Sequence, residues 1–108
     1  MLPSRNRLKK NSDITRVLRL GSRVQYGDFL FIFLKTDGQF RFTSIVRKKE
    51  VRLATVRNLI RRIISETIRQ FIPIANATGD LVVISNLRTP DDLRNQFLLA
   101  LKRWQSEQ

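Results

Sequence analysis

Arginine, lysine and asparagine recur at short intervals in residues 47–69, and these side chains are the ones in the chain best suited to a chemical task. The segment holds eight basic residues and two acidic ones. An arginine guanidinium can bridge two phosphate oxygens, and an asparagine amide can both donate and accept a hydrogen bond. This composition favours binding of a polyanion. The alternative is a solvated helix face that happens to be basic.

A helix over residues 56–71 would position these side chains. At about 100° per residue, its apolar residues fall on one half of the circumference and its basic residues on the other. Arg57 and Arg61 are spaced i,i+4, so they repel each other in an isolated helix, and a bound polyanion would relieve that repulsion. The predicted core face consists of Val56, Leu59, Ile60, Ile63, Ile64, Thr67, Ile68 and Phe71.

The charge of the whole chain also favours binding of a polyanion. Its 108 residues predict a single domain, residues 1–108, with a basic N-terminal arm at residues 1–11. The net charge is +12 and the pI is near 11.6, a balance that raises affinity for phosphate backbones. The longest purely apolar run, residues 29–34, is too short to span a membrane. The absence of cysteine agrees with a cytoplasmic location.

The composition argues against catalysis by the protein itself. The chain has no histidine and no cysteine, which excludes the commonest general base and thiol chemistry. Among its acids only Asp91 and Asp92 are close neighbours, and they are predicted to begin a helix. A nuclease built from protein alone needs grouped carboxylates to hold metal ions. We therefore expect no catalytic residue and no metal site in the chain.

The N-terminal half predicts one helix and three strands. The arm has Leu8 as its expected anchor, and a helix follows at residues 12–20, with Ser12 as its cap and Gly21 after its end. Strands are predicted at residues 22–25, 28–35 and 39–46, the last two joined by a tight hairpin at residues 36–38 and running antiparallel. The alternating faces of the longest strand are Phe29, Phe31 and Phe33 against Leu30, Ile32 and Leu34, and those of the next are Phe40 and Phe42 against Arg41, Thr43 and Ile45.

The C-terminal half adds a strand at residues 81–85 and a final helix that begins at residues 89–92. The core residues of that helix are Leu93, Phe97, Ala100, Leu101 and Trp104. The element order is α-β-β-β-α-β-α, which predicts an α+β fold with helices over a small sheet. The residues alone therefore indicate a basic domain that binds RNA or DNA and has no chemistry of its own.

Several segments also resemble a known family, the bacterial ribonuclease P protein component. They are Arg5-Asn6-Arg7-Leu8-Lys9-Lys10, then Asp13, Gly21, Lys48-Lys49 and the helix start Val56-Arg57-Asn58. The resemblance covers residues 5–104 in matching order. It implies a two-layer αβββαβα sandwich like that of a ribosomal-protein domain. It also implies a left-handed crossover through the basic helix, against the usual right-handed rule.

The resemblance further implies a function. The chain would be the protein subunit of a ribonucleoprotein in which RNA, with Mg²⁺ held mainly by that RNA, removes the 5′ leader of precursor tRNA. Its implied partners are one ribonuclease P RNA per protein and precursor tRNA, with no DNA and no membrane.

The implied contacts fall into two groups. Those with the catalytic RNA are Arg47, Lys48, Lys49, Arg52, Arg57, Asn58, Arg61, Arg62, Arg69, Arg5, Arg7, Lys9 and Lys10. Those with the leader lie in a cleft between the first helix and the sheet, at Ile14, Leu18, Leu30 and Ile32.

This sequence departs from the family pattern at several positions. Leu59 and Ser65 stand where the helix motif has arginine, and Arg52 replaces a loop glycine. The cleft positions Ile14, Leu18 and Ile32 lack the usual aromatic rings. We therefore expect apolar contact and phosphate attraction in the cleft, with weaker base preference.

Three other functions are open to a chain of this composition. They are a structural RNA-binding protein of the ribosomal type, a DNA-binding regulator, and a protein-only nuclease.

Overall fold

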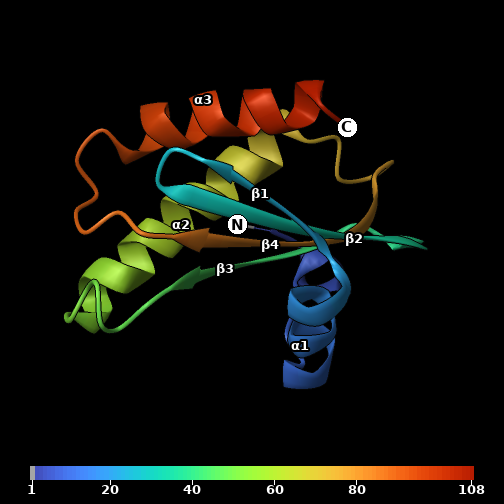
Figure 1. Cartoon of the computed structure of the whole chain (residues 1–108), viewed down its shortest axis with the longest axis horizontal. Helices are drawn as coiled ribbons and strands as arrows, with labels where there is room; N and C mark the ends of the chain where they lie inside the picture. Colours follow the sequence, from blue (N-terminus) through green and yellow to red (C-terminus); the bar gives the residue numbers. More distant parts are fainter. Residues whose placement is uncertain (1) are drawn as a thin grey trace.

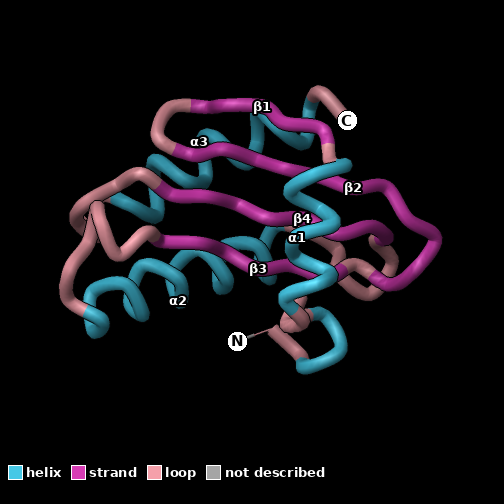
Figure 2. Tube along the Cα trace, turned by 60° about the horizontal axis from the view of Figure 1, so that its bottom comes forward, coloured by secondary structure: helices cyan, strands magenta, loops and turns pink. Residues whose placement is uncertain are grey.

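A four-stranded sheet lies at the centre of the structure, with helices on both of its faces (Figure 1). The computed structural model describes residues 2–108. Helices α2 and α3 cover one face, and α1 lies across the other (Figure 2). The predicted α+β class and element order are confirmed. The elements are η1 (Ser4–Asn6), α1 (Asn11–Leu20), β1 (Ser22–Tyr26), β2 (Phe29–Gln39), β3 (Arg41–Val46), α2 (Ala54–Phe71), β4 (Thr78–Ser85) and α3 (Leu93–Ser106).

Strand β4 occupies the middle of the sheet, whose order is β1-β2-β4-β3. It runs antiparallel to β2 and parallel to β3. The prediction of a hairpin at residues 36–38 is therefore wrong, because β2 and β3 are not neighbours and β2 continues to Gln39, which pairs with Thr78. The physical reason is that β4 is apolar on both of its faces and buried from Gly79 onward. This pattern is typical of a central strand, which has a neighbouring strand on each edge.

The tight hairpin lies elsewhere, between β1 and β2. Tyr26 pairs with Phe29, so Gly27 and Asp28 form a two-residue turn. Gly27 has a φ of +58°, a left-handed conformation that glycine adopts without steric cost.

Strands β3 and β4 are joined by a crossover through α2. Figures 1 and 2 show that this parallel connection is left-handed, the sense that the family resemblance implies. Helix α2 thereby returns along the sheet at the β3 edge.

The alternating residues of the strands pack into two separate cores, one on each face of the sheet. Phe29 and Phe31 are buried on the face that α2 and α3 cover, where the Phe31 ring stacks against Trp104 at 5.6 Å between centroids. On the other face, Ile32 packs with Val17 of α1 in a smaller cluster. The predicted alternation is confirmed, and the predicted core residues of α3 are all buried.

Two predicted core residues of α2 are exposed. Ile60, Ile64 and Ile68 are fully buried, but Leu59 is 38% exposed and Phe71 is 37% exposed. Leu59 is about 100° away from Ile60 around the helix, outside the stripe that faces the sheet. Phe71 is the last residue of α2, where the helix ends.

Gly21 follows the end of α1 as predicted, but for a different reason. Its φ is −72°, which any residue can adopt, so a left-handed cap is not what requires glycine. A Cβ atom there would lie 2.7 Å from the Val17 carbonyl oxygen and 2.8 Å from Ile32 Cγ2. Glycine allows α1 to approach β2 closely at this point.

The predicted helix caps are wrong in detail. Helix α1 begins at Asn11, one residue before Ser12, and its N-cap Lys10 makes no side-chain capping bond. Helix α3 begins at Leu93 rather than within residues 89–92. The hydroxyl of Thr89 accepts a hydrogen bond from the Asp91 amide at 2.9 Å and forms a turn before the helix.

Candidate nucleic-acid interface

The N-terminal arm, residues 2–10, is docked along the free edge of β3. The Leu8 amide donates to the Phe42 carbonyl at 2.9 Å, and Arg7 pairs with Phe42 in a parallel bridge. The Asn6 amide nitrogen donates to the Phe40 carbonyl at 2.6 Å. Leu2, Asn6 and Leu8 are all buried, so the arm has three anchors rather than the one predicted. Docking fixes the positions from which Arg7 and Lys9 project.

The basic side of α2 faces away from its buried stripe. Arg57 Nη1 donates to the carbonyl oxygens of Val51 and Arg52, at 2.8 and 2.7 Å. Arg57 therefore also holds the loop before α2 against the helix. Arg61 donates a hydrogen bond to Asn58 Oδ1, which leaves the Asn58 amide nitrogen available to a ligand.

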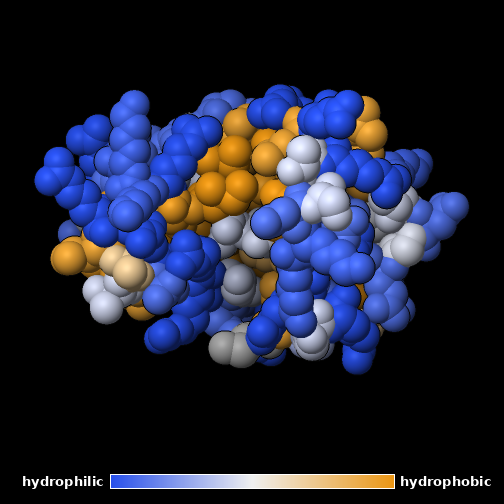
Figure 3. All heavy atoms as spheres, turned by 90° about the horizontal axis from the view of Figure 1, so that it is seen from below, coloured by the Kyte–Doolittle hydropathy of each residue, from blue (hydrophilic) through white to orange (hydrophobic). Residues whose placement is uncertain are grey.

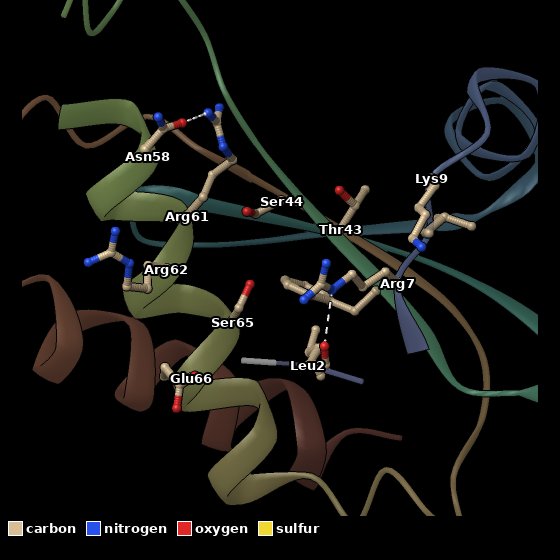
Figure 4. Close-up of a pocket in the computed structure, with 12 residues that line it drawn as sticks. Leu2, Arg7, Lys9, Thr43, Ser44, Asn58, Arg61, Arg62, Ser65 and Glu66 are labelled. Atoms are coloured by element: carbon tan, nitrogen blue, oxygen red, sulfur yellow. Dashed lines mark hydrogen bonds between the residues drawn. The ribbon is translucent and has the colours of Figure 1, made fainter. Parts of the chain in front are cut away.

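The arm, β3 and α2 together enclose a groove of about 380 Å³ (Figure 4). Figure 4 shows Arg7 and Lys9 on the arm side and Arg61 and Ser65 on the helix side. Five of the residues predicted to contact RNA line this groove, although they come from two segments far apart in the sequence. They are Arg7, Lys9, Asn58, Arg61 and Arg62.

The other predicted RNA contacts lie outside the groove. Arg47, Lys48, Lys49 and Arg52 are exposed in the loop between β3 and α2, so they extend the basic surface past the start of the helix. Arg5 and Lys10 are exposed on the arm. Arg69 is set apart from them near the C-terminal end of α2, where it forms an ion pair with Glu66 at 2.9 Å.

The four predicted leader-cleft residues lie together on the α1 face of the sheet. Ile32 is fully buried in the smaller core, whereas Ile14, Leu18 and Leu30 are half-buried around it. Figure 3 shows apolar surface on this side of the molecule, bordered by hydrophilic side chains.

Ile45 belongs to the same apolar cluster and was not among the predicted cleft residues. Strand alternation places Ile45 on the other face of β3 from Phe40 and Phe42. That alternation is the sequence pattern that predicts its position on the α1 face.

An ion-pair cluster fixes α1 to the sheet beside this surface. Arg41 donates to both carboxylate oxygens of Asp80, at 2.9 and 2.8 Å, and to Asp13 of α1 at 3.2 Å. The hydrogen bond with Asp80 is the main cause that raises the pKa of Arg41, and burial partly opposes it. The Asp80 side chain is only 3% exposed, so this guanidinium compensates a buried charge.

Within residues 2–108, no three acidic side chains are grouped closely enough to hold a metal. In the same part of the chain, no helix is both long and apolar enough to cross a membrane.

The fold, the docked arm and the basic groove define a small, strongly basic α+β protein. A family model for ribonuclease P matches residues 2–105, so the chain belongs to the ribonuclease P protein family. Similar relatives include the ribonuclease P protein component of Brevibacillus brevis, 32% identical with 91% of this chain and 82% of that protein covered. The corresponding protein of Acidothermus cellulolyticus is 36% identical, with 77% and 71% covered.

Solved structures agree with this membership. The RNase P protein of Staphylococcus aureus is 27% identical and superposes with a TM-score of 0.78, covering 92% of this chain and 94% of that chain. The RNase P protein of Thermotoga maritima is 25% identical, with a TM-score of 0.70 and 90% and 96% covered. The chain therefore has the role of this family, a protein subunit in the 5′ processing of tRNA, in partnership with ribonuclease P RNA.

Proposed function

We propose that this chain is a non-catalytic subunit that binds ribonuclease P RNA through the groove and through the basic loop between β3 and α2. The observation that carries the proposal is the two-sided arrangement of the groove. Arg7 and Lys9 on the arm face Arg61 on α2 across a hollow of about 380 Å³. Positive charge on both walls of a concave site concentrates the field where an RNA phosphate would enter.

The same proposal assigns the 5′ leader of precursor tRNA to the apolar surface beside α1. Leu18 and Leu30 leave part of their side chains accessible there, and Ile45 extends the surface along β3. Arg23 of β1 borders this side and donates to the Leu18 carbonyl at 2.5 Å. Without aromatic rings at Ile14, Leu18 and Ile32, the surface supplies apolar contact with little stacking, so it would bind leaders of different sequence similarly.

Catalysis would belong to the RNA, and so would most of the magnesium, because the described residues offer no grouped carboxylates. In this proposal one protein binds one ribonuclease P RNA in the cytoplasm. The protein contributes cationic and apolar surface that holds RNA and substrate together.

The experiment is cleavage of precursor tRNA by the cognate ribonuclease P RNA at low magnesium, with and without the purified chain. We expect the protein to restore cleavage. A variant with Asn58→Ala, Arg61→Gln and Arg62→Gln should lower the restored rate at least about tenfold, because each lost phosphate contact weakens RNA binding. Arg57 is left intact because it also holds the loop.

The matched control is Arg94→Gln with Lys102→Gln. It also removes two positive charges, but from exposed positions on α3. It should restore cleavage to within about twofold of the native chain. Tight RNA binding without restored cleavage would instead identify a structural RNA-binding protein.

A further inference from the structure

The groove carries a second chemical feature besides its positive charge. We propose that it holds one unpaired ribonucleotide of the partner RNA, with the phosphate between the arm and α2 and the ribose against hydroxyl groups on the facing walls. This inference rests on the proposed RNA binding and adds the kind of nucleotide that the groove accepts.

The hydroxyl groups come from Ser44 on β3 and Ser65 on α2. In Figure 4 both point into the space between the strand and the helix. Neither hydroxyl makes a hydrogen bond with the residues that the structure describes. The two hydroxyls belong to residues that line the groove, where Ser44 is 8% exposed and Ser65 is half-buried. They can therefore donate to or accept from a ribose 2′-hydroxyl.

The cations of the groove are held in place before any ligand arrives. Arg7 Nε donates to the Leu2 carbonyl at 3.0 Å, which leaves its two terminal nitrogens for a phosphate. Lys9 is held by Ser4 Oγ at 2.6 Å. Across the groove, Arg61 is oriented by its bond to Asn58. Because these side chains are already ordered, less rotamer entropy is lost when a phosphate binds.

The size of the groove selects for an unpaired nucleotide. Its volume of about 380 Å³ lies at the small end of ligand sites, which span roughly 300 to 1,000 Å³. A paired nucleotide is held within its helix, whereas an unpaired one can turn out of the chain and enter a pocket. The short side chains of Ser44 and Ser65 leave this space open, and a large side chain at residue 65 would fill it.

The test uses the ribotrinucleotide ApApA as the probe at fixed low salt. Backbone amide shifts in NMR locate the bound probe, and isothermal titration measures its affinity. We expect shifts at Ser44, Ser65 and Arg7. We also expect about fivefold weaker binding for the all-deoxy trinucleotide and for a probe whose central base is removed.

Three variants distinguish binding in the groove from general attraction to a positively charged surface. Ser65→Tyr should weaken ApApA binding about tenfold by filling the groove without changing charge, whereas Ser65→Ala should keep its affinity within about threefold. Ser44→Ala removes the facing hydroxyl with little change in volume and should abolish most of the preference for ribose over deoxyribose. Urea unfolding checks that each variant is folded.

Equal affinity for ribose, deoxyribose and abasic probes would overturn the inference, because the groove would then bind phosphate alone. Shifts confined to the α1 face would also overturn it. Neither result depends on whether the native chain restores precursor tRNA cleavage, so failure of the proposed function would be seen separately.

Discussion

The two faces of the sheet are built from alternate residues of the same strands, yet they are covered to different extents. Helices α2 and α3 bury Phe29 and Phe31 completely on one face. On the other face, Ile32 is buried in a smaller cluster with Val17 of α1 and Leu8 of the arm, and Leu30 and Ile45 stay half-buried. The first face supplies most of the buried apolar area and hence most of the stability. The second can keep accessible apolar surface because the fold does not depend on covering it.

Truncation on each face tests this difference most directly. Phe31→Ala should lower the free energy of unfolding by about 3–5 kcal/mol, because it leaves a cavity beside Trp104. Leu30→Ala, on the opposite face of the same strand, should cost only about 1–2 kcal/mol, because that side chain is already half-exposed. Urea unfolding of both variants measures the two values. Equal losses would show that the two faces contribute equally.

Loss of the ion-pair cluster beneath α1 should have the next largest effect on the free energy of unfolding. Arg41→Gln should lower the free energy of unfolding by about 2 kcal/mol, because it leaves the buried carboxylate of Asp80 without its cation. Asp13→Asn, which removes only the more exposed carboxylate of the cluster, should cost less than about 1 kcal/mol.

The pH dependence of the Arg41 effect follows from its raised pKa. The stabilisation is complete below the pKa of arginine in the unfolded chain and is lost only as the pH rises through the higher folded value. We therefore expect the difference between Arg41→Gln and the native chain to contain no contribution from Arg41 titration between neutral and mildly alkaline pH. Urea unfolding of both proteins at several pH values measures this difference in stability.

A side chain placed where α1 approaches β2 closely should have a smaller effect on the free energy of unfolding. Gly21→Ala should destabilise by about 1–2 kcal/mol, because the new methyl group meets the Val17 carbonyl and Ile32. The expected response is a small shift of α1 away from the sheet, visible as NMR shift changes at Val17 and Ile32 but not at Phe31. Changes spread equally over both faces would contradict a local effect.

The smallest expected effect concerns binding on the open face. Ile45→Ala should lower the preference of the assembled enzyme for precursor over mature tRNA about threefold to fivefold, by removing roughly 1 kcal/mol of apolar contact with the leader. Stability should fall by no more than about 1.5 kcal/mol, since Ile45 is half-buried. Competition binding with the two RNAs measures the preference, and Leu99→Ala, at an exposed residue of α3, is the control.

Local patterns in the sequence predicted most elements but not how they meet. The alternation of Phe29 to Leu34 and the stripe containing Ile60 and Ile64 identified the strand, the helix and their buried faces. The position of β4 between β2 and β3 was missed because its pairing joins residues that are 39 to 56 positions apart in the sequence, and a plausible local turn competed with it. Membership of the family, by contrast, followed from motif order.

The candidate site was predicted as a set of residues rather than as a shape. Arg61 and Asn58 were identified from their types and spacing, and the structure brings them opposite Arg7. The groove itself depends on Asn6, a polar residue that is buried because its amide reaches the Phe40 carbonyl. Composition gives no sign of such a long-range hydrogen bond, so the arm could not be distinguished from a frayed terminus.

The central position of β4 also affects how the chain folds during synthesis. Residues 78–85 leave the ribosome after β1, β2 and β3, so the β1–β2 hairpin and β3 must wait for the strand that joins them. Until then, the inner edges of β2 and β3 present unpaired backbone groups that can pair with other chains. A nascent chain stalled before residue 78 should therefore be prone to aggregate, and slowing translation just upstream of β4 should lower the yield of folded protein.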